Sequence, residues 1–285
     1  MRIRSASETP LNTPADSLLG QPVAYAGHYD ASRLFPIARA TQRGTLGITG
    51  TLPFHGGDIW NAYELSWLDR RGRPRVALAR FDVPADSPNL IESKSLKLYL
   101  NGFMQTSMAD AEAVAERLRA DLSAAAGATV AVRLSTLAQF EDETIGRLAG
   151  DCIDEADTDI DHYGPPRAGE LLADADAAAE ETLVSHALKS NCPVTGQPDW
   201  ASVQVSYAGP RIDRAALLRY LAGYREHSDF HEHCVERIFL DLSARCAPRR
   251  LLVYARYTRR GGLDINPWRS SQPQPAPDNR RSARQ

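Results

Sequence analysis

Cys192 stands in a segment whose residue types could support covalent chemistry. The segment reads SNCPVTGQPDW over residues 190–200, so that the carboxyl group of Asp199 follows the thiol by seven residues. Asparagine, proline and glycine favour turns and loops over a buried strand. We therefore expect Cys192 to face a pocket as a nucleophile, with Asp199 as the nearby acid. The alternative is structural, because most cysteines are small buried hydrophobes.

A second polar segment, IESKSLKLYLN, covers residues 91–101. One interpretation is a helix start, capped by Glu92 or Ser93, with Lys94 and Lys97 in solvent. The other is an anion site, because hydroxyls, a lysine and free N–H groups at a helix N-terminus suit phosphate.

The segment HSDFHEHC over residues 227–234 contains groups that could bind a metal. His227 and His231 are four residues apart and Cys234 follows, so zinc must be considered. Cys192 would have to complete such a site in space, because no second Cys/His cluster stands close in the sequence.

The same segment also admits two readings without a metal. Asp229 could cap a helix with Glu232 as its capping-box partner, which would leave His231 in the core. Alternatively, His231 and Glu232 face a pocket at the helix start, where Glu232 could accept paired N–H donors from a purine-like ring.

Near the end of the chain, residues 256–268 read RYTRRGGLDINPW. Two arginines followed by two glycines would let the backbone approach a ligand while guanidinium groups bind phosphate. A solvated basic loop is the alternative. The sequence has no G-x-G-x-x-G fingerprint, so a Rossmann nucleotide site is not indicated.

The composition excludes several function classes. The 285 residues are 43% apolar and 24% charged with a net charge of −3, which is typical of a globular protein without a nucleic-acid-binding surface. No apolar run is long enough to cross a bilayer, and the first residues lack the apolar stretch of a secretory signal. Four scattered cysteines then predict reduced thiols in the cytoplasm.

The chain divides into two similar halves. We predict a flexible arm over 1–20, an N-terminal module over 21–140, an acidic linker over 141–175, a C-terminal module over 176–270 and a disordered tail over 271–285. Each module is expected to run strand, strand, helix, helix, strand. The predicted ranges are 59–68, 75–83, 95–103, 109–126 and 129–134 in the first, and 181–188, 200–207, 213–224, 230–245 and 250–257 in the second. This order predicts an α+β fold, an antiparallel sheet with helices on one face.

Together these segments resemble a known family, the long, two-module form of NADPH-dependent 7-cyano-7-deazaguanine reductase (QueF). The resemblance rests on four segments in the family's order: ESKSLKLYLNGFMQT (92–106), SNCPVTGQPDW (190–200), FHEHCVERIF (230–239) and RYTRRGGLDINPWR (256–269). It implies tandem tunnelling-fold (T-fold) modules, each an antiparallel sheet with two helices on one face. It also implies a homodimer, with the site where the halves meet, within one chain or across the dimer.

The resemblance also implies roles for individual residues. Cys192 is the nucleophile and Asp199 the proton donor. The deazapurine substrate and the NADPH cofactor are assigned to two sets that share Ser93: Ile91, Glu92, Ser93, His231 and Glu232 for the substrate, and Ser93, Lys94, Arg260 and Gly261 for the cofactor. No metal is expected.

The implied reaction is the four-electron reduction of a nitrile to an amine in queuosine (tRNA modification) biosynthesis. Cys192 adds to the nitrile carbon to give a covalent thioimide, two hydrides from NADPH follow, and the imine between them must be kept from water. Two alternatives remain at this stage. One is a zinc-dependent hydrolase or cyclohydrolase on the same fold, with zinc held by Cys192, His231 and Cys234. The other is a non-catalytic purine-binding module.

Overall fold

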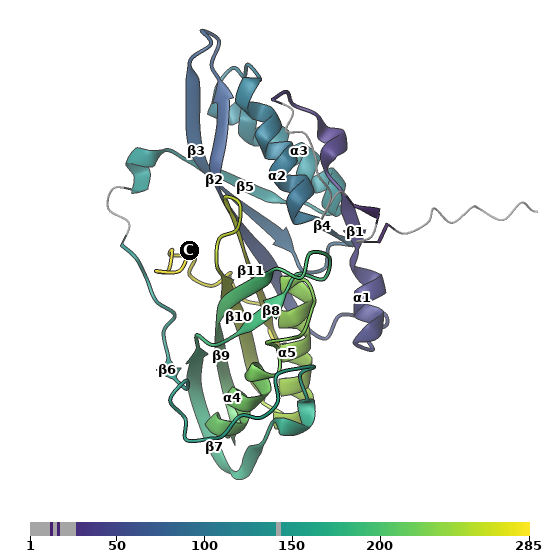
Figure 1. Cartoon of the computed structure of the whole chain (residues 1–285), viewed down its shortest axis with the longest axis vertical. Coiled ribbons are helices and arrows are strands. Elements are labelled where there is room, and N and C mark those ends of the chain that lie inside the picture. The colour runs from purple at the N-terminus through teal and green to yellow at the C-terminus, as the bar shows by residue number, and fades with distance from the viewer. Residues whose placement is uncertain (1–11, 14–15, 18–26, 141–143) are drawn as a thin grey trace, which may run out of the picture.

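The computed structural model describes residues 12–13, 16–17, 27–140 and 144–285 (Figure 1). The predicted arm over 1–20 lies almost wholly outside these residues, as does the start of the predicted N-terminal module. Within them, a mixed α+β architecture is found, as predicted. Its main feature is a nine-stranded sheet in the order β5-β3-β2-β11-β10-β9-β7-β6, with β8 paired to β9.

The first half of the chain supplies one end of this sheet and the helices beside it (Figure 1). A small separate sheet pairs β1 with β4 in antiparallel fashion. The elements are β1 (Pro36–Ala38), α1 (Arg39–Thr45), β2 (His55–Leu68), β3 (Pro74–Pro84), β4 (Asn89–Ile91), α2 (Ser93–Asn101), α3 (Ala111–Ala126) and β5 (Ala131–Ser135).

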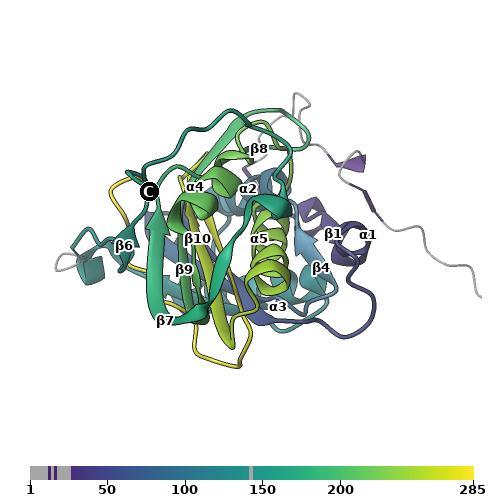
Figure 2. The same cartoon turned by 90° about the horizontal axis from the view of Figure 1, so that it is seen from below.

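The second half supplies the other end of the sheet. Its elements are β6 (Asp151–Cys152), β7 (Ala173–Ser185), β8 (Lys189–Asn191), β9 (Pro198–Ile212), α4 (Arg214–Ala222), α5 (His231–Cys246), β10 (Arg250–Tyr257) and β11 (Leu263–Ser270). The pairings within the main sheet are antiparallel except that of β6 with β7. One apolar core lies under α2 and α3 and another under α4 and α5, so both helix pairs cover the same side (Figures 1 and 2).

The predicted strands and helices agree with these elements to within a few residues at most ends. β7 differs most, because it begins at Ala173 and ends at Ser185, whereas the prediction covered 181–188. Its first part alternates acidic residues with alanine, and that pattern carries no apolar strand signal.

Strand β11 was not predicted, since its sequence was read as part of a basic, glycine-containing loop. It pairs with β2 along Leu263–Ser270 and with β10 on the other side, and so joins the two halves into one sheet. Its polar residues Asp264, Asn266 and Arg269 are all buried, which explains why the sequence does not read as an apolar strand.

Within the described residues, parts of the segments expected to be a linker and a disordered tail pack against the rest of the fold. Within the linker, Ile153 and Leu171 are buried in the second core. In the tail, the side chain of Gln285 is 5% exposed and bonds to Arg256 and Asn266. Buried polar groups on the sheet accept and donate these bonds, a signal that composition alone does not contain.

Within the described residues, none of the helices combines the length and apolar character needed to span a bilayer.

Candidate active site

A cavity of about 870 Å³ lies between the two helix pairs, on the side of the sheet that the helices cover. This volume is within the range of small-molecule sites, roughly 300–1,000 Å³. The cavity brings together segments far apart in the sequence: β2, the start of α2, the loop after β8, the start of α5, and the turn between β10 and β11. Of the residues predicted for the site, it is lined by Ile91, Ser93, Lys94, Cys192, Asp199, His231, Glu232, Arg260 and Gly261.

Cys192 lies in the loop that joins β8 to β9. Its N–H donates to the carbonyl of Gln197 at 2.8 Å, and its carbonyl accepts from the N–H of Gly196 at 3.0 Å. Gly196 has a φ of 67°, a conformation that glycine adopts without steric cost. The tight loop leaves the Cys192 side chain 7% exposed in the cavity wall, so the thiol is both nearly buried and within reach of a bound ligand.

Asp199 lies just past this loop, in register with Ser190 of β8. Its carboxylate bonds to the Arg260 guanidinium through Oδ1, and its Oδ2 lies 3.3 Å from Nε2 of His231. Burial opposes ionisation of Asp199, but His231 and Arg260 outweigh it and hold its pKa below the usual value. The carboxyl is therefore charged in this arrangement.

Glu92 differs from the expectation that it faces the substrate. It is the N-cap of α2, and its carboxylate accepts from the N–H groups of Lys94 at 2.7 Å and Ser95 at 2.8 Å. The residue is fully buried and does not line the cavity. Burial raises its pKa, and those N–H groups oppose the rise. The cap expected at this helix start is therefore present, with Glu92 as the N-cap, while Ser93 and Lys94 next to it line the cavity.

The start of α5 presents His231 and Glu232 to the cavity. The His231 ring stacks on the Tyr257 ring, with 3.7 Å between centroids and 7° between planes. Its Nδ1 is buried and has no hydrogen-bond partner within the part of the chain described. Glu232 is 3% exposed, and burial together with the charge of Asp58 raises its pKa, against Arg39 and His231.

The capping box read at this helix start is not present. Phe230 is the N-cap, and the Asp229 carboxylate instead accepts from the Phe230 N–H at 2.9 Å and bonds to His233. His233 is buried, and its Nε2 lies 2.9 Å from the Gln42 carbonyl. The contact with Gln42 of α1 spans 191 positions, so a local motif could not reveal it.

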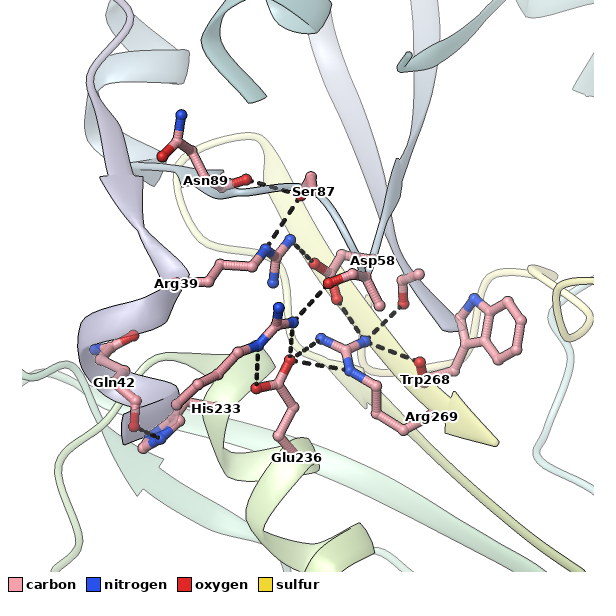
Figure 3. Close-up of polar contacts among 12 residues, drawn as sticks. Arg39, Gln42, Asp58, Ser87, Asn89, His233, Glu236, Trp268 and Arg269 are labelled. Atoms are coloured by element: carbon pink, nitrogen blue, oxygen red, sulfur yellow. Dashed lines mark hydrogen bonds and ion pairs between the residues drawn. The ribbon is translucent and has the colours of Figure 1, made fainter. Parts of the chain in front are cut away.

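A buried charge network holds α5 against the first half of the chain (Figure 3). Arg269 of β11 donates to Asp58 of β2 at 2.9 Å and to Glu236 of α5 at 2.8 Å. Two residues of α1 complete it: Arg39 pairs with Asp58 at 2.5 Å, and Arg43 with Glu236 at 2.7 Å. Because Glu236 lies one turn beyond Glu232, the network fixes the helix end that faces the cavity.

Lys97 also lines the cavity, whereas the capped-helix interpretation of this segment placed it in solvent. It stands three residues after Lys94 on the same helix, a spacing that could have shown that the two share a face. Its side chain packs on Gly261, whose φ is 56°, and a Cβ built at Gly261 would lie 2.5 Å from Lys97 Nζ. The turn and the start of α2 thus form a close-fitting positive surface with Arg260.

The described residues include no group of three or more His, Cys, Asp or Glu side chains arranged to hold a metal ion. Cys234, one of the three ligands of the zinc alternative, is fully buried in the second core, and burial raises the pKa of its thiol. The geometry therefore does not favour the zinc alternative.

Comparison with known proteins gives two family matches. A family described as "Nitrile reductase, 7-cyano-7-deazaguanine-reductase N-term" matches residues 25–134, and one described as "QueF-like protein" matches residues 198–276. A protein of Chromobacterium violaceum, named NADPH-dependent 7-cyano-7-deazaguanine reductase, is 58% identical over 275 residues, which cover 96% of this chain and 98% of that protein. A protein of Albidiferax ferrireducens with the same name is 56% identical over 289 residues, with 96% and 100% covered.

A solved structure also matches, the crystal structure of the archaeosine synthase QueF-Like in the apo form. It has a TM-score of 0.30 and 18% identity, and the match covers 34% of this chain and 96% of that one.

Proposed function

The chain belongs to the NADPH-dependent 7-cyano-7-deazaguanine reductases, and we propose that it reduces this nitrile to the amine through a covalent bond to Cys192. The activity follows from family membership. The observation that carries the mechanism is the shared cavity, in which the thiol and the carboxyl of one segment meet a positively charged turn of another. In the cell, the product amine would enter queuosine biosynthesis.

The first step needs one proton shared by Cys192 and Asp199. Asp199 takes the thiol proton, the thiolate adds to the nitrile carbon, and the displaced π electrons move to nitrogen. Asp199 returns the proton to that nitrogen, which leaves a thioimide and a carboxylate. The lowered pKa of Asp199 keeps it ionised, so the carboxylate is available to accept the thiol proton at the start of this cycle.

Glu232 and His231 would bind the ring of the substrate. A buried carboxylate with a raised pKa is costly to leave unpaired, and the paired N–H donors of a guanine-like ring would satisfy it. Ile91 and Ser93 would contact the ring from the start of α2. Glu92 would act through its cap, by holding the N-terminus of α2 in place.

Ser93, Lys94, Arg260 and Gly261 would hold NADPH. The fit is supported by the close packing of Gly261 on Lys97, which leaves room for a backbone approach but not for a side chain. Arginine and lysine at this place suit phosphate. When bound, NADPH supplies hydride to the carbon that Cys192 has activated.

We further propose a tandem T-fold, with modules over 21–140 and 176–270 joined by the linker over 141–175. The order of strands and helices in each half supports this division. A homodimer is proposed too: β5 is an edge of the sheet, and Leu137, Phe140 and Ile145, which follow β5 in the chain, are exposed. Light scattering would test the dimer.

The proposed location of the protein is the cytoplasm. Four free cysteines support such a reducing compartment.

The mechanism is tested by intact mass after incubation with 7-cyano-7-deazaguanine in the absence of NADPH. We expect wild type to gain the full mass of the nitrile, because addition expels nothing, and Cys192→Ala to gain none. Cys152→Ala, which removes an exposed thiol, is the matched control and should gain the same mass as wild type. An unmodified wild-type protein would contradict the thioimide.

A further inference from the structure

The sheet is split beneath the cavity. Strands β10 and β11 pair only from Leu252↔Ser270 to Tyr254↔Trp268, although β10 continues to Tyr257 and β11 begins at Leu263. Beyond the paired part, β10 remains bonded to β9 and β11 to β2. The two half-sheets therefore separate towards the turn that carries Arg260 and Gly261.

The two faces of this split have different surroundings. Side chains alternate along a strand, and Leu263 and Ile265 of β11 line the cavity. Asp264 and Asn266, which alternate with them, face the opposite side, where Asn61 and Tyr63 of β2 donate to Asp264 at 2.7 Å and 2.6 Å. Figure 1 shows the end of the chain on this side of the sheet, away from the helices.

The side-chain amide of Gln285 bridges the split. Its Nε2 donates to the carbonyl of Tyr257 on β10 at 3.0 Å and to Oδ1 of Asn266 on β11 at 2.7 Å. Its Oε1 accepts from Nε of Arg256 at 2.7 Å. Both the NH2 group and the oxygen of this amide thus form hydrogen bonds. They join β10 and β11 where the two strands no longer pair with each other.

The rest of the tail supplies acceptors to the same buried cation. Arg256 is 3% exposed, and its NH1 donates to Oδ1 of Asn279 at 3.1 Å and to the carbonyl of Asp278 at 3.5 Å, besides the Tyr254 hydroxyl at 2.8 Å. Without the tail, this guanidinium would keep only one of these acceptors. A buried charge that loses its partners recruits water.

We propose that the segment 278–285 is a plug that closes the floor of the cavity, with Gln285 as the positioning residue that ties β10 to β11. The plug acts on the reaction in two ways: it keeps water out of the split, and it holds the turn that carries Arg260. This inference rests on the proposed nitrile reduction, because the imine between the two hydride transfers is the species that water would destroy.

The chemical consequence can be measured. Water that reaches the imine adds to its carbon, and ammonia leaves, so that an aldehyde forms after one hydride instead of an amine after two. We expect Gln285→Ala to raise the aldehyde fraction several-fold and to lower the NADPH consumed per nitrile. A chain ending at Pro277 should show a larger change. Gln274→Ala, an exposed glutamine in the same tail, is the matched control and should resemble wild type.

A second readout does not depend on turnover. Hydrogen exchange of the backbone amides in 255–266 should become faster in Gln285→Ala than in wild type and in Gln274→Ala, since the bridge across the split is lost. Unchanged exchange in Gln285→Ala would overturn the plug whatever the protein catalyses. Faster exchange with an unchanged aldehyde fraction, in a wild type that makes the amine, would overturn its role in excluding water.

If the proposed function were wrong, wild type would make neither amine nor aldehyde. The hydrogen-exchange result would still show whether the segment 278–285 acts as a plug. If the chain ending at Pro277 does not fold, as judged by circular dichroism, Gln285→Ala decides alone.

Discussion

Asp199 and Arg260 form an ion pair inside the cavity, between the hairpin that carries the thiol and the turn assigned to the cofactor. In this arrangement the acid of the proposed addition and the cation of the proposed phosphate site neutralise each other. A phosphate that draws Arg260 away would leave Asp199 with His231 alone, and its pKa would rise. Occupancy of the cofactor site and the protonation of Asp199 are thereby linked.

We therefore expect Arg260→Ala to change how the rate of adduct formation depends on pH. The acidic side of this profile, where the rate falls with falling pH (the acid limb), should move to higher pH. The addition needs one proton on the pair of Cys192 and Asp199, and below the pKa of Asp199 both groups are protonated. Loss of Arg260 raises that pKa, so activity is lost at a higher pH on acidification. The rate of mass gain, measured without NADPH across pH, checks this.

The control is Arg259→Ala, because Arg259 lies over the Tyr63 ring and does not line the cavity. It should keep the wild-type profile. A limb that stays in place or moves to lower pH in Arg260→Ala would show that Arg260 does not control the charge of Asp199.

Gly261→Ala should weaken NADPH binding and leave adduct formation nearly unchanged. The new Cβ would lie 2.5 Å from Lys97 Nζ on a backbone with φ of 56°. The lysine or the turn must therefore move, and the KM for NADPH should rise more than kcat falls. Gly72→Ala has a similar φ of 72° with nothing within 4 Å, so it reports the backbone cost alone. Equal effects of both variants would rule out the close-packing argument.

The strands and helices of this chain were predictable where local patterns carry the information. Alternation in β2 and the apolar stripe of α5 depend only on neighbours in sequence. Strand β11 was missed because three of its polar residues are buried in long-range contacts, with Arg269 bonded to Asp58 across 211 positions. No window of sequence contains such a pair.

In the candidate site, too, some residues were predictable from local patterns and others were not. Cys192, Asp199 and the arginine turn could be identified because turn residues and charges cluster around them. Glu92 was expected at the substrate, but its carboxylate is used by the backbone of its own helix. Competition between a cap and a ligand depends on which way the carboxyl points, and the residue type does not determine that.

Glu232→Gln should weaken binding of the deazaguanine, because an amide presents a donor where the ring also presents donors. A hydrogen bond to a charged group contributes about 1.5–3 kcal/mol, so a loss of at least tenfold in affinity is expected. A ring without the 2-amino group should lose affinity for wild type but much less for Glu232→Gln. Calorimetry on both proteins with both rings forms a double-mutant cycle, and additive losses would exclude this pairing.

The pH dependence of this binding has a defined sign. The pKa of Glu232 is raised, so the carboxylate is lost at a higher pH than for an ordinary glutamate. Affinity for the deazaguanine should accordingly fall on acidification at a higher pH than an ordinary glutamate would give. Glu232→Gln should lack this fall.

Glu236→Gln should destabilise the protein, because it leaves Arg43 and Arg269 buried without their carboxylate. Breaking a buried pair costs about 3–5 kcal/mol in unfolding free energy. Burial opposes ionisation of Glu236, but the arginines hold its pKa at about 2, against 4.5 for the ordinary group. A lowered pKa adds stability that is complete above pH 4.5 and is lost as the pH falls towards 2.

The difference in unfolding free energy between wild type and Glu236→Gln should thus be largest near neutral pH and should shrink through this window. Urea unfolding at a series of pH values measures it. Glu112→Gln, an exposed carboxyl 3.8 Å from Arg119, should differ little from wild type at any pH. A difference for Glu236→Gln that stays constant down to the acid limit would mean that the side chain acts by its shape, and that its charge does not hold α5 to the first half of the chain.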